Sequence, residues 1–163
     1  SGGLDEYQVE SLVHGGAPID IFGMGTKTGV SADAPWSDMA YKLVCYDGRP
    51  VMKLSQDKSY RPGAKQVYRL SGAQVGFDRD VIGLENEPAA AGDPLLEPVM
   101  DQGKLISPSP SLDQIRETFN QDFERLDPHF KVLGGPPRYT VAVSPALERL
   151  TKRVQDSIAS AGP

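Results

Sequence analysis

Two glycine turns separated by a single helix constrain the fold of this chain most strongly. Ser1-Gly2-Gly3 opens the sequence, residues 4–14 have helical spacing, and Asp20-Ile-Phe-Gly-Met-Gly-Thr26 follows. Small residues at such turns leave backbone N–H groups free beside helix starts, which is how proteins cradle phosphate without a cationic side chain. Two turns one βα unit apart predict a phosphate site shared by neighbouring loops at one end of a parallel barrel. The candidate phosphate-binding residues are Ser1, Gly2, Gly3, Gly23, Met24, Gly25 and Thr26.

The segment between these turns has clear start and stop signals. Asp5 and Glu6 lie in the first turn of the expected helix, and Gly15-Gly16 ends it. Residues 19–22 are apolar and predict a short buried strand. The two acids compete with an anion for the helix N-terminus, so they could cap the helix or hold a substrate hydroxyl.

Residues 39–110 change character and predict antiparallel strands. Asp47-Gly48 is a strong two-residue hairpin signal, because both central positions of a type I′ turn need positive φ. The strands of this meander are expected at residues 39–46, 51–55, 65–70 and 80–84, with an edge strand at 94–100 and a loop or linker at 85–93.

Two helices are expected near the end of the chain. Ser111-Leu-Asp-Gln114 is a capping-box pattern, and Ser144-Pro145 places proline at the first helical position. The first helix has an apolar stripe, which we expect to belong to a core rather than to a cofactor site: Leu112, Ile115, Phe119, Phe123 and Leu126. The second has Leu147, Leu150, Val154 and Ile158 on one face. The fold class expected is α/β, with barrel units at 1–38, an antiparallel segment at 39–110 and a helical segment at 111–163.

Composition excludes several classes of function. The chain has 163 residues, whereas a complete (β/α)8 barrel takes about 250. Its net charge is -5 with no long basic run, so nucleic acid and anionic membranes are poor partners. One cysteine excludes an internal disulfide framework. Cys45 lies in an alternating apolar run and is expected in a core or sheet, which is consistent with a cytoplasmic location.

Few side chains suggest catalysis directly. His14 lies at a helix end and His129 in a loop, and neither has the spacing of a metal ligand pair. Asp33 and Asp38 flank Pro35-Trp36 and could bind magnesium or be surface loop acids. Several basic residues follow the turns and could face an anion or a solvated sheet face: Lys27, Lys42, Lys53, Lys65 and Arg69.

Several blocks of sequence, in order, resemble nicotinate phosphoribosyltransferase. They run through most of the chain: Ser1-Gly-Gly-Leu-Asp-Glu-Tyr7, Gly16-Ala-Pro-Ile-Asp20, Phe22-Gly-Met-Gly-Thr26, Ser31-Ala-Asp-Ala-Pro35, Tyr41-Lys-Leu-Val44, Gly48-Arg-Pro50, Lys53-Leu-Ser55, Pro62-Gly-Ala-Lys-Gln-Val67, Pro94-Leu-Leu96 and Pro110-Ser-Leu-Asp-Gln-Ile-Arg116.

The resemblance implies an enzyme of NAD salvage that joins nicotinate to 5-phosphoribosyl 1-diphosphate and couples this to ATP hydrolysis. It implies an irregular α/β barrel with an additional domain, usually in a homodimer, and ATP with Mg²⁺ for the full enzyme. It also places the nucleotide phosphate on the two glycine turns. The phosphorylated histidine and the ring-binding residues of the family belong to earlier sequence, so no catalytic residue is assigned here.

The chain begins inside this site, so we interpret it as the C-terminal part of such an enzyme, with the remainder as a partner. Alone, we expect it to be catalytically incomplete and poorly soluble or self-associating. Two alternatives stay open: a non-catalytic module that binds phosphate or nucleotide or assists assembly, and a relative of quinolinate phosphoribosyltransferase.

Overall fold

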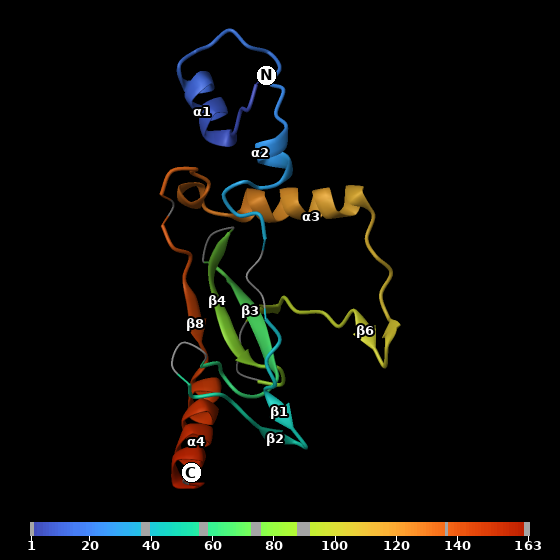
Figure 1. Cartoon of the computed structure of the whole chain (residues 1–163), viewed down its shortest axis with the longest axis vertical. Coiled ribbons are helices and arrows are strands. Elements are labelled where there is room, and N and C mark those ends of the chain that lie inside the picture. The colour runs from blue at the N-terminus through green and yellow to red at the C-terminus, as the bar shows by residue number, and fades with distance from the viewer. Residues whose placement is uncertain are drawn as a thin grey trace. The chain divides into compact units, whose positions relative to one another are not determined.

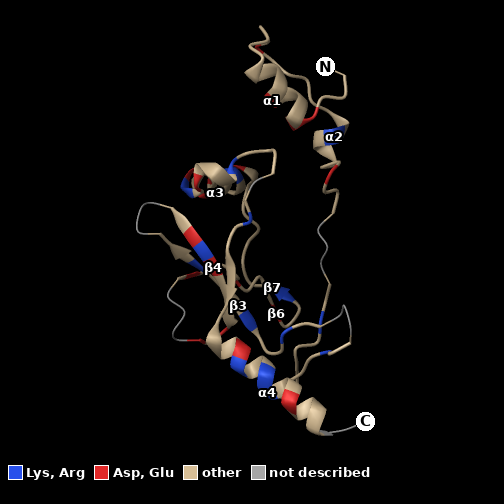
Figure 2. Ribbon diagram, turned by 90° about the vertical axis from the view of Figure 1, so that its left-hand side faces the viewer, with Lys and Arg blue, Asp and Glu red and all other residues tan. Residues whose placement is uncertain are grey.

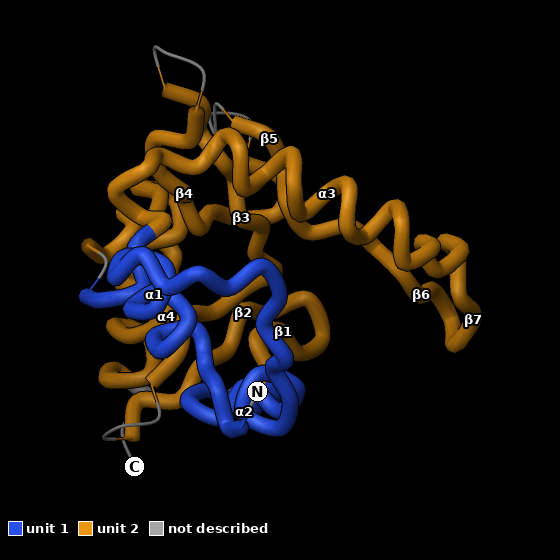
Figure 3. Tube along the Cα trace, turned by 90° about the horizontal axis from the view of Figure 1, so that it is seen from above, with its two compact units in different colours: residues 1–41, 132–136 blue, residues 42–131, 137–163 orange. Residues whose placement is uncertain are grey.

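The computed structural model describes residues 2–36, 40–55, 59–72, 76–87, 92–135 and 137–161. The chain forms two compact units, coloured separately in Figure 3. Unit 1 holds residues 1–41 and 132–136, and unit 2 holds residues 42–131 and 137–163. The units divide the chain differently from the three expected segments, because residues 137–161 pair and pack with strands of the middle segment.

Unit 1 contains α1 (Glu6–His14) and the short α2 (Thr26–Gly29). Asp5 begins α1 through a capping box: its carboxylate accepts the Gln8 N–H at 2.9 Å, and its own N–H donates to the Gln8 side chain at 3.1 Å. The Gly15 N–H then donates to carbonyls of the last turn. The helix expected over 4–14 is therefore confirmed, with its first helical residue at Glu6.

The buried strand expected at residues 19–22 is wrong. These residues form no strand, and Ile21 is 87% exposed. Nor does any strand occur in residues 2–36. A strand needs the N–H and C=O groups of a neighbouring strand, and no other part of residues 2–36 supplies one.

Unit 2 is built on a four-stranded mixed sheet (Figure 1). Its order is β5 (Asp93–Pro94), β3 (Lys65–Ser71), β4 (Phe77–Leu84), β8 (Val141–Val143). The strands expected at 65–70 and 80–84 are confirmed and pair antiparallel. Strand β8, which the sequence analysis missed, pairs parallel with β4. Figure 2 shows that both β4 and α4 carry acidic and basic residues.

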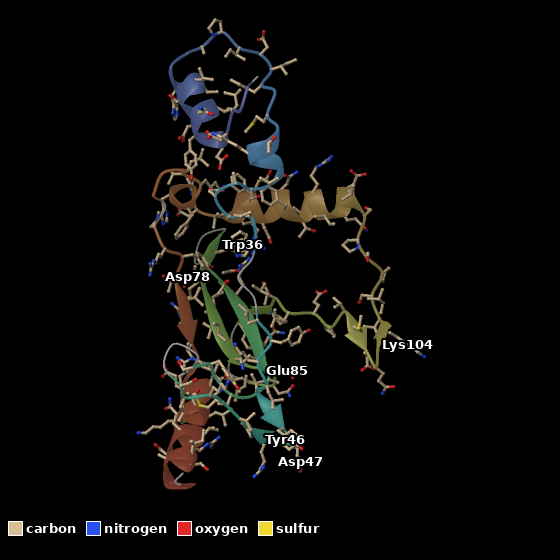
Figure 4. All side chains as sticks on the ribbon, viewed as in Figure 1. Trp36, Tyr46, Asp47, Asp78, Glu85 and Lys104 are labelled. Atoms are coloured by element: carbon tan, nitrogen blue, oxygen red, sulfur yellow. The ribbon has the colours of Figure 1, made fainter. Side chains whose placement is uncertain are left out.

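Two small hairpins flank the first three strands of this sheet in the sequence, one before β3 and one after β5. Strands β1 (Cys45–Tyr46) and β2 (Arg49–Pro50) flank the predicted turn, where Asp47 has φ 47° and Gly48 has φ 71°. Figure 4 shows Tyr46 and Asp47 at its tip. The turn is confirmed. Of the strand expected at 39–46, residue 39 lies outside the described residues and the rest forms a strand only at Cys45–Tyr46. The strand expected at 51–55 is wrong, because the second strand of the hairpin is Arg49–Pro50.

The edge strand expected at 94–100 is confirmed only at its start, because β5 (Asp93–Pro94) lies at the edge of the sheet and residues 95–99 form no strand. The second hairpin follows, with β6 (Met100–Asp101) and β7 (Lys104–Leu105).

Three helical segments complete unit 2: α3 (Leu112–Arg125), the 3₁₀ turn η1 (Pro128–Phe130) and α4 (Pro145–Ala161). Both predicted starts are confirmed, since Ser111 forms a capping box with Gln114 and the Ser144 hydroxyl accepts the Leu147 N–H at 3.1 Å. The stripe of α3, which was expected in a core, is largely exposed: Leu112 is 81% and Phe119 is 63% exposed. On α4, Leu147 is 0% exposed.

The stripe of α3 is therefore not core in this structure, although its C-terminal residues Phe119, Phe123 and Leu126 line a hollow against β3 and β4. Among the described residues, no helix combines the length and the apolar character that crossing a membrane requires.

Replacing Leu147 by alanine should lower the free energy of unfolding of unit 2 by about 2–5 kcal/mol, because a fully buried side chain leaves a cavity. Leu112→Ala removes the same atoms from an exposed position and should cost less than about 0.5 kcal/mol. Urea unfolding followed by circular dichroism measures both. Equal losses would contradict the burial pattern.

Candidate functional site

The first predicted turn lies ahead of α1, whose N-terminus is already occupied. Gly2 and Gly3 have φ values of 119° and 73°, and nothing lies within 4 Å of where their Cβ atoms would be. Ser1 lies outside the described residues. The Asp5 carboxylate caps α1, so of the two roles open for this acid in the sequence, the structure supports the cap. An anion at this turn would meet glycine backbone rather than the helix end.

The second turn presents unpaired backbone donors. Gly25 precedes α2 and no side chain caps this helix. Within the described part of the chain, the N–H groups of Met24, Gly25 and Thr26 donate to no protein acceptor, and all three residues are exposed. With four residues, α2 contributes little dipole, so the backbone N–H groups are what this turn offers to an anion.

One ion pair brings the segments after the two turns together. Lys27 Nζ lies 2.7 Å from Asp5 Oδ2. This hydrogen bond, with the Gln8 N–H, holds the pKa of the Asp5 carboxyl below its ordinary value. A hollow of about 260 Å³ lies here, lined by Asp5, Glu6, Tyr7, Lys27, Ala32 and Asp33. The structure thus brings the flanks of both turns to one place, and phosphate binding there stays a prediction.

The described residues do not form a metal site. Asp33 lines this hollow with Asp5 and Glu6, but no three His, Cys, Asp or Glu side chains among the described residues are arranged to hold one ion. Asp38, the other predicted magnesium candidate, lies outside the described residues. His14 ends α1, and His129 contacts Asp127 in η1. Neither histidine lines the hollow.

A polar cluster in unit 2 was missed by the sequence analysis. Asp80 accepts from Nε and Nη2 of Arg69, both at 2.9 Å, and from the Tyr139 hydroxyl at 3.2 Å. The cluster ties β3 and β4 to the residue pair before β8, so Arg69 serves the sheet rather than an anionic ligand. Burial and the Asp80 charge raise the pKa of Tyr139. The sequence signal for this cluster was limited to the alternation of charged and apolar residues in the two strands, Arg69-Leu70 on β3 and Asp80-Val81 on β4.

Lys65, another predicted cation, and Cys45 both lie in strands, whereas Lys42 and Lys53 are exposed. Lys65 donates to the carbonyls of Arg61 and Gly63 at 2.8 and 2.6 Å, and burial lowers its pKa. Cys45 lies in β1 and is exposed, so it is a sheet residue but not a core residue. A second hollow, of about 620 Å³, lies in unit 2 between residues 49–52 and α4, and none of the predicted site residues line it.

Comparison with known proteins identifies the family. Residues 89–151 match the family model described as the nicotinate phosphoribosyltransferase C-terminal domain. Nicotinate phosphoribosyltransferase pncB2 of Mycobacterium tuberculosis is 43% identical over 146 residues, which are 88% of this chain. The chain belongs to the nicotinate phosphoribosyltransferase family. The Bos taurus member is 32% identical over 178 aligned positions, covering 94% of this chain.

A solved structure of the family shows the same α/β arrangement. The human nicotinic acid phosphoribosyltransferase matches with a TM-score of 0.61 and 29% identity over 71% of this chain. The match covers 26% of the human chain, and 31% and 33% of the M. tuberculosis and Bos taurus proteins. The chain therefore spans about a third of the length of the curated nicotinate phosphoribosyltransferases that it matches.

Removing the Lys27 ammonium should raise the pKa of Asp5 toward its ordinary value of 3.8. Because the folded pKa is lowered, the stabilisation is present above that ordinary value and is lost as the pH falls through the folded pKa. NMR titration of the Asp5 carboxyl carbon in Lys27→Met measures this shift. Lys53→Met, in unit 2, is the control and should leave the midpoint unchanged. An unchanged midpoint in Lys27→Met would show that the pair does not form.

Replacing Asp80 by asparagine should destabilise unit 2 by about 1–3 kcal/mol, because the partly buried Arg69 guanidinium loses its charged acceptor. Tyr139→Phe removes one hydroxyl donor and should cost about 1 kcal/mol. Chemical denaturation ranks the two variants. A larger loss for Tyr139→Phe would contradict the geometry of the cluster.

Proposed function

We propose that this chain is the C-terminal portion of a nicotinate phosphoribosyltransferase, which forms nicotinate mononucleotide and diphosphate from nicotinate and 5-phosphoribosyl 1-diphosphate with ATP hydrolysis, in NAD salvage. The support is the match of residues 89–151 to the family's C-terminal domain and the curated relatives named for this activity. The activity belongs to the whole enzyme, and this chain alone should not turn over substrate.

Its part in the reaction is to seat the 5′-phosphate on the two glycine turns. The observation that carries this proposal is the set of exposed, unpaired N–H groups of Met24, Gly25 and Thr26, next to a segment tied to the first turn by Lys27 and Asp5. Backbone donors suit a phosphate oxygen without requiring a cation. The Gly2-Gly3 turn would complete the seat, because Asp5, which follows it, is paired with Lys27.

Seating the phosphate would help the transfer by orientation. The reaction loosens the bond between ribose and diphosphate, so positive charge develops on the sugar and negative charge on the leaving group. Binding energy from the remote phosphate can fix the sugar carbon relative to the nicotinate nitrogen, which lowers the entropic part of the barrier. No residue of this chain is assigned to stabilise the developing charges.

Lys27 would act on this seat indirectly. A phosphate near Asp5 would be repelled by an uncompensated carboxylate. The ammonium at 2.7 Å neutralises that charge and holds the carboxylate on the helix cap. A positioning role for Lys27, rather than direct phosphate contact, follows from this pairing.

The finer architecture belongs to the same proposal. Residues 1–38 would be the last βα units of an irregular barrel, and the exposure of Ile19 and Ile21 supports this, because neighbouring barrel strands would cover them. The hairpins and β3–β4 pair of residues 39–110 would be the antiparallel part of the additional domain. We also propose a homodimer in the cytoplasm. ATP and Mg²⁺ are expected for the full enzyme, but the described residues do not fit a metal ion, so neither is assigned to them.

Ribose 5-phosphate is a direct probe of the seat. Adding it should shift the backbone amide NMR signals of residues 23–27 in the chain itself. Thr26→Pro removes one N–H at the first position of α2, where proline is tolerated, and should weaken affinity about tenfold, as expected for one charge-assisted hydrogen bond.

Thr26→Val is the matched control, because it removes the hydroxyl and keeps the N–H. It should bind with nearly unchanged affinity. Shifts elsewhere in the chain, or equal affinity for the native chain and both variants, would overturn the phosphate seat while leaving family membership intact.

A further inference from the structure

The larger hollow of unit 2 has two walls, residues 49–52 and α4, which are held together at their base. Figure 1 shows β2 and α4 at the same end of the sheet. The Val44 carbonyl accepts the Val51 N–H at 3.0 Å and the Gly63 N–H at 2.8 Å, which holds the first wall. Gly63 also lies against the second wall, since a Cβ there would be 3.0 Å from Leu150 Cδ2. The hollow is therefore part of the packing of unit 2.

The floor of this hollow is an elongated apolar surface. Leu150, Val154 and Ile158 follow one another at four-residue spacing on α4, so they form a row of roughly 12 Å along one face of the helix. Apolar side chains make up most of the lining: Pro50, Val51, Met52, Leu150, Val154 and Ile158. The volume of about 620 Å³ is in the range of small-molecule pockets. An apolar row of this length suits an alkyl chain.

The charged side chains that line the hollow, among the described residues, are both basic. They are Arg49 of β2 and Arg153 of α4, and neither forms an ion pair with a described carboxylate. The Ser157 hydroxyl lies one helical turn beyond Arg153 in the same lining. The whole chain has a net charge of -5, so this lining is opposite in sign to the molecule. The planar fork of a guanidinium matches the two oxygens of a carboxylate.

We propose that this hollow binds a small alkyl carboxylate, whose chain lies on the row of Leu150, Val154 and Ile158 and whose carboxylate is bound by Arg49 and Arg153. A hydrophilic anion would leave the apolar row uncovered, and a neutral alkyl chain would leave both guanidinium groups without an acceptor. The lining shares no residue with the proposed phosphate seat, so this inference does not rest on the proposed function.

Decanoate is the probe, and the full chain is the protein tested. Calorimetric titration should show saturable binding of a single decanoate per chain, and the NMR methyl signals of Val154 and Ile158 should shift. Decanol has the same alkyl chain without the charge and should bind about tenfold more weakly, as expected for loss of a charge-assisted hydrogen bond. Equal affinities for the two probes would overturn the proposal. Uptake of several decanoates with loss of the circular dichroism signal would overturn it as well.

Two arginine variants test the carboxylate contact. Arg153→Gln should weaken decanoate binding about tenfold and leave decanol binding unchanged. Arg149→Gln removes the same charge from an exposed position of α4 outside the lining, and should leave both affinities nearly unchanged. Equal losses in the two variants would show a general attraction to a basic helix and would contradict a specific site.

A second pair of variants tests the apolar row. Ile158→Asp adds a carboxylate to the floor and should abolish decanoate binding, and because Ile158 is 41% exposed the variant should keep the circular dichroism spectrum of the native chain. Ala159→Asp adds the same charge at the next residue, which is exposed and does not line the hollow, and should still bind decanoate. Binding that survives Ile158→Asp would refute the proposed position of the chain.

Two further outcomes separate this proposal from its alternatives. Sedimentation tests a second copy of the chain as the occupant: a dimer that takes up no decanoate would overturn the proposed ligand. Ribose 5-phosphate separates this site from the phosphate seat. Signal shifts at residues 23–27 with no response to decanoate would overturn the hollow and leave the proposed function standing, and the converse result would support the hollow alone.

Discussion

The packing of unit 2 depends on the hydrogen bonds that the Glu87 carboxylate accepts. Its Oε2 accepts from the Ser144 hydroxyl at 2.5 Å and from the Leu84 N–H at 3.2 Å, and Ser144 in turn caps α4. One carboxylate thus joins the end of β4 to the start of α4 and so fixes where Leu147 enters the core. Gly83 permits this approach, because a Cβ there would lie 2.9 Å from Glu87 Oε2.

Unit 1 has no comparable interaction. None of its described residues is buried, and its two helices are joined by the exposed pair of Lys27 and Asp5. Exposed ion pairs contribute about 0–1 kcal/mol and weaken with salt. The glycine turns therefore depend on covering structure for rigidity, which a barrel would provide. The unit without buried residues is also the one proposed to bind phosphate, and its exposed apolar residues and unpaired N–H groups are what the proposed barrel end would show before it is covered.

Local signals in the sequence predicted local structure well. The Ser111 and Ser144 caps, the Gly15 stop and the Asp47-Gly48 turn all form, because each depends on residues a few positions apart. Features that depend on distant partners were not predictable in this way. Strand β8 was missed, because its pairing with β4 joins segments about 60 residues apart. The stripe of α3 and the apolar residues 19–22 have patterns that indicate burial, but a pattern does not say whether the covering surface lies within the same chain.

The difference between local signals and features that depend on distant partners also applies to the prediction of the functional site. The glycine turns were predicted as one site, and the Lys27–Asp5 pair gives that prediction a geometric basis, since it joins segments 22 residues apart. Phosphate binding and transfer differ in what they require of the protein. Binding needs donors, and the turn at residues 23–26 has them; transfer needs the sugar held to within a fraction of an ångström of its acceptor. Exposed turns on an uncovered unit can provide the donors but not that precision. Under the proposed function, positioning the sugar would therefore require structure that covers residues 19–22, so covering this unit and positioning the phosphate would be two aspects of one physical requirement.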